Sequence, residues 1–145
     1  MWKAHKGDFY AAFLPGGKTL VTAGADDATL RLWDITTRRQ IRRLGRTSNA
    51  FCSLAITPDG TRIAVGITCK SNGVIRFYDP NTGYELASLA GHKDGVKDLA
   101  FIPDGRMLVS VATDGMRVWR APSLAEAESD NVDPGASLGP RRERP

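Results

Sequence analysis

The sequence lacks the long apolar runs that would mark a membrane or secreted protein. No stretch of its 145 residues approaches the roughly 20 consecutive apolar residues of a membrane-spanning helix, and the first six residues lack the apolar centre of a signal peptide. We therefore expect no membrane association and a cytoplasmic location.

Cysteine is also scarce. Cys52 and Cys69 show no metal-ligand spacing, and two cysteines are too few for a disulfide scaffold in a chain of this length. We expect reduced thiols, no metal and no cofactor. Alternation places Cys52 on the inward side with Leu54 and Ile56, and Cys69 is expected to be the more exposed thiol.

Long helical patterns are absent before residue 121, whereas one alternating pattern occurs three times, at residues 29–34, 74–79 and 116–120. Alternation of apolar and polar residues is typical of strands. Each copy contains an aromatic residue near its end, and these aromatics are Trp33, Tyr78 and Trp119.

Turn signals recur in register with these aromatics. Pro15, Pro58 and Pro103 each begin a proline–glycine turn and lie 43 and 45 residues apart. Proline presets φ and glycine accepts a positive φ, so each turn can join two antiparallel strands. Repetition near this period indicates a propeller or a solenoid.

The pattern between turns predicts eleven short strands. We expect them at residues 9–13, 19–23, 28–33, 40–44, 51–56, 62–67, 74–78, 84–89, 96–101, 107–111 and 116–119. Four strands per unit is the composition of a propeller blade. The expected fold is all-β: a partial propeller of about three blades over residues 1–120 (blades about 4–44, 45–90 and 91–120). Residues 121–145 are expected to form a short helical turn, with Ser123 as N-cap, followed by a disordered tail.

The third copy resembles the WD-repeat (WD40) family of β-propellers, because a Gly91–His92 pair, a Pro-Asp-Gly turn and a final tryptophan follow in that order. The resemblance implies two groups of hydrogen-bonded structural residues. They are His92, Ser110, Asp114 and Trp119 in the third copy, and His5, Thr22, Asp27 and Trp33 in the first. Asp114 lies one residue closer to its tryptophan than Asp27 does, so one turn must be tighter than the other.

The second copy departs from this pattern. Arg46 or Thr47 stands where the histidine belongs, Val65 is near the Ser/Thr position, Asn72 replaces the aspartate and Tyr78 replaces the tryptophan. We expect this blade to rely mainly on packing.

No catalytic residues are expected. His92, Ser110 and Asp114 have the residue types of a hydrolytic triad, but no nucleophile turn or oxyanion hole accompanies them. The arginines in residues 38–46 could attract nucleic acid. However, no aromatic residues alternate with them, and their position fits the exposed outer strand of a blade, so nucleic-acid binding is the less favoured interpretation.

Two loops of the second copy are candidates for binding a partner. Arg46, Asn49, Lys70 and Asn72 are expected at one end of that blade, where they would form a shared polar surface. The alternative is that these loops are only solvated turns.

Three blades are fewer than the four to eight that typically close a propeller ring. We expect additional blades from the rest of a longer chain or from self-association. The leading function is a non-catalytic protein-interaction scaffold with a protein partner. Residues 119–124 resemble the end of bacterial WD-repeat arrays, so the alternative is a regulatory or sensor segment of a multidomain enzyme, such as a bacterial serine/threonine kinase, whose catalytic domain is elsewhere. A truncated product that does not fold alone is a third alternative.

Overall fold

The computed structural model describes residues 2–68 and 72–120. The expectations for Cys69, Lys70 and the segment 121–145 therefore lie outside the described residues. Within the two described ranges every regular element is a strand, and no helix is long and apolar enough to cross a membrane.

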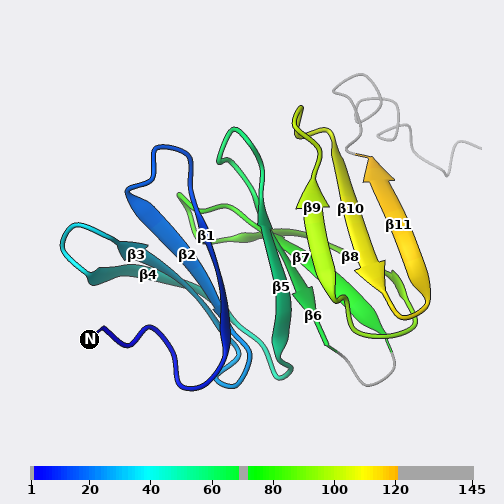
Figure 1. The fold of residues 1–145 in the computed structure, drawn as a ribbon, viewed down its shortest axis with the longest axis horizontal. Coiled ribbons are helices and arrows are strands. Elements are labelled where there is room, and N and C mark those ends of the chain that lie inside the picture. Colours follow the sequence, from blue (N-terminus) through cyan, green and yellow to red (C-terminus); the bar gives the residue numbers. More distant parts are fainter. Residues whose placement is uncertain (1, 69–71, 121–145) are drawn as a thin grey trace, which may run out of the picture.

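Eleven strands form three antiparallel sheets placed side by side (Figure 1). The first sheet consists of β1 (Phe9–Phe13), β2 (Thr19–Gly24), β3 (Thr29–Asp34) and β4 (Arg39–Arg46). The second consists of β5 (Phe51–Ile56), β6 (Ile63–Ile67), β7 (Gly73–Tyr78) and β8 (Glu85–His92). Within the described residues the third consists of β9 (Asp98–Phe101), β10 (Met107–Ala112) and β11 (Gly115–Arg120). The predicted all-β partial propeller is confirmed.

Each sheet is a meander in which consecutive strands pair. The first strands of successive sheets contact one another, β1 with β5 and β5 with β9, so they form the inner side of the array. β4 and β8 are the outer strands of their blades. They extend beyond the predicted segments to Arg46 and His92, so the residues that begin each sequence repeat end the outer strand of the preceding sheet.

Two apolar clusters join the sheets. The cluster between the first and second sheets contains the fully buried Leu30, Phe51 and Ile63. The cluster between the second and third includes Ile75 and Val96, both fully buried, with Trp119 packed against it. Burial of these β-branched and aromatic side chains between faces is what holds neighbouring blades together.

The predicted turns also join the sheets. Gly60 and Gly105 both have φ near +72°, and each packs against the proline of the preceding blade's turn. A Cβ at Gly60 would lie 2.8 Å from Cδ of Pro15, and one at Gly105 would lie 3.3 Å from Cδ of Pro58. The repeated Pro-Gly signal therefore specifies both a turn and a contact between blades.

Cys52 packs against an apolar cluster, but the prediction that it shares the side of Leu54 and Ile56 is wrong. A β-bulge between Phe51 and Ser53 interrupts the pairing of β5 with β6, so alternation is broken at Cys52. Leu54 and Ile56 pack on the first cluster, whereas Cys52 packs on the second and donates its thiol hydrogen to the carbonyl of Val96, at 2.6 Å.

Candidate functional site

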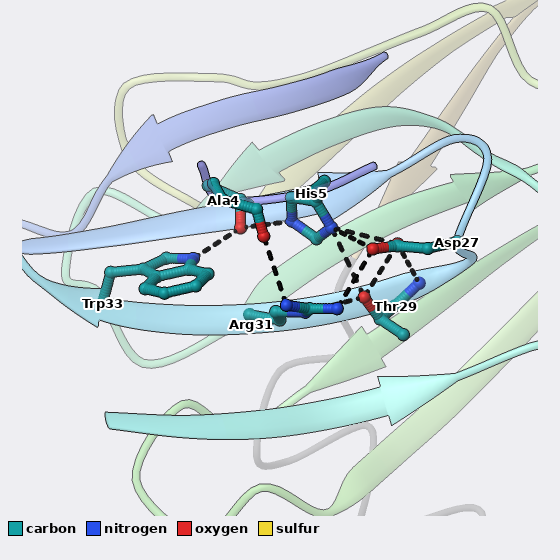
Figure 2. Close-up of polar contacts among 7 residues, drawn as sticks. Ala4, His5, Asp27, Thr29, Arg31 and Trp33 are labelled. Atoms are coloured by element: carbon teal, nitrogen blue, oxygen red, sulfur yellow. Dashed lines mark hydrogen bonds and ion pairs between the residues drawn. The ribbon is translucent and has the colours of Figure 1, made fainter. Parts of the chain in front are cut away.

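The first sheet contains a continuous hydrogen-bonded network at the end where β2 turns into β3 (Figure 2). Trp33 Nε1 donates to Thr22 Oγ1 at 2.7 Å, and Thr22 Oγ1 lies 2.6 Å from His5 Nε2. His5 Nδ1 lies 2.9 Å from a carboxylate oxygen of Asp27. Asp27 in turn accepts from the backbone N–H and the hydroxyl of Thr29.

The third sheet repeats this arrangement. Trp119 Nε1 donates to Ser110 Oγ at 2.7 Å, Ser110 Oγ lies 2.7 Å from His92 Nε2, and His92 Nδ1 lies 2.6 Å from Asp114. The backbone N–H of Lys93 also donates to Asp114, at 2.9 Å. His92 belongs to β8 of the second sheet, so this network links two blades.

One assignment of protons satisfies every group in both networks. Tryptophan donates to the hydroxyl, the hydroxyl donates to Nε2 of a neutral histidine, and Nδ1–H donates to the aspartate. His5, Thr22, His92 and Ser110 are all buried, and a buried polar group without a partner would destabilise the fold. Complete satisfaction makes the networks rigid connections between loops and sheets.

The two carboxylates respond to these partners. Burial raises the pKa of Asp27, but hydrogen bonds from His5 and Thr29 outweigh it, and the pKa lies below its ordinary value. Hydrogen bonds from the Lys93 backbone and from His92 lower the pKa of Asp114 to about 2. Both aspartates are therefore anionic at neutral pH, as the networks require.

The turns that supply the aspartates differ as predicted. Ala112 pairs with Gly115, which leaves a two-residue turn around Asp114. In the first sheet, Ala23 pairs with Leu30, and the longer turn brings Asp27 back over Gly24. A Cβ at Gly24 would collide with the Asp27 carboxylate, so a glycine is needed there.

The geometry of the His92–Ser110–Asp114 group does not suit nucleophilic catalysis. Ser110 is fully buried, and its hydroxyl is held by Trp119 on one side and His92 on the other. A nucleophile must reach a substrate carbonyl near an oxyanion hole. Over the two described ranges, moreover, no three histidine, cysteine or carboxylate side chains gather as metal ligands would.

The second sheet lacks the side chains for such a network. Val65 occupies the register position of Thr22 and Ser110, and Arg46, which takes the histidine position, is exposed. Tyr78 is buried in the first apolar cluster, and its desolvation raises its pKa. Packing replaces polar contacts in this blade.

An arginine that sequence analysis did not single out stands at the same register position in each sheet. Arg31 donates to Asp27 and to the carbonyl of Ala4 (Figure 2), and Arg117 lies 3.6 Å from Asp114. Arg76 has no such aspartate and contacts Glu85 at 3.4 Å. The signal was present in the three alternating segments, each of which contains this arginine two residues before the aromatic.

The predicted partner-binding residues within the described ranges lie at the same end of the first two sheets, and Arg46 belongs to the first sheet and not to the second. Arg46 ends β4, Asn49 precedes β5 and the exposed Asn72 precedes β7. β5 begins where β6 ends, since Phe51 pairs with Ile67, so these loops share the end that also contains the two networks. We call this end the loop face; Lys70 is outside the described residues.

The loop face is hollowed near the inner strands. A depression of about 520 Å³ is bordered by Tyr10 of β1, Cys52 of β5 and the loop 94–97 before β9. Asp94 and Lys97 are exposed at its rim, so both signs of charge are present. The hollow therefore lies beside the first strands of all three sheets, and charged side chains stand at its rim.

Three four- or three-stranded antiparallel meanders, packed face to face with their first strands inside, define a β-propeller protein. The network of tryptophan, hydroxyl, histidine and aspartate occurs in the first and third of the three blades. The sequence profile described as "WD domain, G-beta repeat" matches residues 1–34, 38–79 and 83–120. The chain belongs to the WD40 family.

Relatives of this chain come from distant organisms. It is 33% identical over 125 residues to the transcription factor unc-37 of Caenorhabditis elegans, covering 85% of this chain and 20% of that protein. It is 33% identical over 128 residues to the WD repeat-containing protein sll1491 of Synechocystis, covering 86% and 35%. For human coronin-7 the identity is 31% over 133 residues, covering 84% and 14%. The chain thus spans about a third or less of these relatives.

Proposed function

We propose that this chain is a non-catalytic protein-interaction scaffold that forms part of a larger propeller and binds a protein partner through its loop face. WD40 domains generally mediate protein–protein interactions. The observation that carries the proposal is the pair of buried networks, which attach the loops of this face to the sheets and so hold a binding surface in a fixed shape.

The outward faces of the terminal sheets support the addition of blades. Phe9 and Phe13 of β1 are 47% and 54% exposed, and Met116 and Val118 of β11 are 69% and 58% exposed. Trp119 faces the second sheet, so by alternation Met116 and Val118 face away from it. Apolar faces of this kind are covered by neighbouring blades in a ring, supplied by a longer chain or by other copies.

Size-exclusion chromatography with light scattering tests the blade addition. We expect a mass above the 15.7 kDa of one chain, or association with separately supplied blades. A folded monomer that stays monomeric at high concentration and binds no further blades would contradict it.

Affinity capture with paired charge reversals tests the loop face. Arg46→Glu changes the loop face, whereas Arg39→Glu changes an exposed arginine at the opposite end of the same strand, β4. We expect a specific partner to be lost with the first variant and retained with the second. Equal retention of every bound protein by both variants would exclude Arg46 from the binding surface.

A further inference from the structure

The contact between the second and third blades contains a groove. This groove of about 470 Å³ has an apolar floor that includes Phe77, Leu89 and Trp119, and Arg62 and Arg106 stand at its rim. Arg120, the last described residue, also lines it. The groove therefore lies where the chain continues into residues 121–145.

The contact between the first and second blades shows what fills this place. There, the turn after β7 packs on the outer strand β4 of the preceding blade. Arg42 Nη1 donates to the carbonyl of Asn81 at 2.6 Å, and a Cβ at Gly83 would lie 3.2 Å from Cδ of Arg42 and 3.6 Å from Cδ2 of Leu44. The aliphatic part of the Arg42 side chain thus fills the space between these two blades, and Gly83 packs on top of it.

At the contact between the second and third blades, the positions of the large and the small residue are reversed. Ala87 of β8 occupies the register position of Arg42. Arg42 pairs with Leu32 and Ala87 pairs with Phe77, and Leu32 and Phe77 each stand directly before the aromatic residue that ends the repeated strand pattern. Gly83 stands five residues after Tyr78, and five residues after Trp119 the sequence has Leu124. A small residue thus replaces the arginine, and a large apolar one replaces the glycine.

Charge is complementary as well. Residues 121–133 contain four acidic residues and no basic residue, and the first acidic residue stands two positions after Leu124. The acidic residues are Glu126, Glu128, Asp130 and Asp133. Carboxylates next to an arginine-rimmed apolar groove are attracted to it, and attachment in the same chain gives the segment a high effective concentration there.

We propose that residues 121–130 bind back onto this groove, with the Leu124 side chain packed on Ala87 and Leu89 and the carboxylates of Glu126 and Glu128 facing Arg62 and Arg106. Leucine disfavours the positive φ of Gly83, and Pro122 lacks an N–H, so we do not expect the segment to repeat the turn of the second blade. It covers the groove instead as an intramolecular contact on the blade for which the described residues contain three strands. This inference is independent of the proposed partner binding.

Tryptic cleavage of the full chain between Arg120 and Ala121 tests the proposal, because docking protects this bond and cleavage tracks the undocked fraction. Leu124→Ser should raise the cleavage rate about tenfold or more. The matched control is Leu138→Ser, the same change at the other leucine of residues 121–145, which should leave the rate unchanged. Circular dichroism establishes that both variants are folded.

A groove variant tests the other side of the contact. Ala87 is exposed, so Ala87→Met is compatible with folding, fills the groove and should accelerate the same cleavage. The double variant with Leu124→Ser should be no faster than either single variant, since both remove one contact. Equal rates for Leu124→Ser and Leu138→Ser, or no effect of Ala87→Met, would overturn the proposal. Protection that grows with protein concentration would assign the groove to a second copy instead.

Discussion

Asp114 connects the outer strand of the second blade to the turn between β10 and β11 of the third. It accepts from His92 on the outer strand of the second blade and from the Lys93 backbone, while its own turn joins β10 to β11. Trp119 completes the network through Ser110 and packs on the second cluster. Single residues at this site therefore control the attachment of one blade to another.

Removal of Trp119 should destabilise the fold more than a change in the segment after it. We expect Trp119→Ala to lower the free energy of unfolding by about 3 kcal/mol, because it deletes a packed indole and leaves Ser110 with one partner fewer. Asp114→Ala should lower the melting temperature as well. Leu138→Ala is the comparison; similar melting temperatures for all three variants would contradict the structural role of the network.

Stability should also depend on pH in the acid range. Hydrogen bonds lower the folded-state pKa of Asp114 to about 2, while an unfolded aspartate titrates near 3.9. The stabilisation is therefore complete above about pH 4 and is lost as the pH falls towards 2. Thermal melts between pH 2 and 6 should show a shallower acid decline for Asp114→Asn than for the unchanged chain. Parallel curves would show that Asp114 does not contribute to the acid dependence.

At the scale of elements, the turns fit one blade onto the next. Gly60 has φ +72° and packs on Pro15, and Gly105 repeats this contact on Pro58. The second sheet, which has no polar network of the kind found in its neighbours, depends on these contacts and on the buried Tyr78.

A pair of glycine substitutions separates the two roles of these turns. Gly16→Ala and Gly60→Ala both place alanine at a positive φ, which costs roughly 1 kcal/mol, but the space around Gly16 is open. Gly60→Ala should cost at least about 1 kcal/mol more, because its Cβ displaces Pro15 of the neighbouring blade. Urea unfolding measures the difference, and equal losses of stability would show that the contact between turns is unimportant.

At the scale of the whole molecule, the array has two unequal ends. β1 and β11 present the apolar faces of terminal blades, with Phe13 at one end and Val118 at the other. Contacts between unlike faces are head-to-tail and continue until a ring closes. Assembly is therefore expected to depend on these two faces and not on the outer strands.

Val118→Glu should consequently weaken self-association, because the charge would be buried against the next blade. Ile41→Glu on the outer strand β4 is the control, since Ile41 is 55% exposed and Val118 is 58% exposed. Light scattering should show a lower mass for the first variant only. If both variants keep the mass of the unchanged chain, the face of β11 is not an assembly surface.

The strands and their grouping could be predicted from the sequence, because alternation, turn residues and a repeat near 44 residues are local or periodic signals. The members of the two networks followed instead from the resemblance to the WD-repeat family. The arginine beside each network was visible in the same pattern but was not recognised. Cys52 was misplaced, because a single-residue bulge leaves no signal in an alternating segment.

Tertiary structure alone decided how the repeats divide in space. His92 belongs by sequence to the third repeat and by pairing to the second sheet, since strand pairing depends on residues far apart in the chain. The groove beside Ala87 likewise exists only when two blades meet, because its depth depends on which side chain each outer strand presents to the next blade. Local pattern specifies the blades, and packing between them specifies the surfaces available for binding.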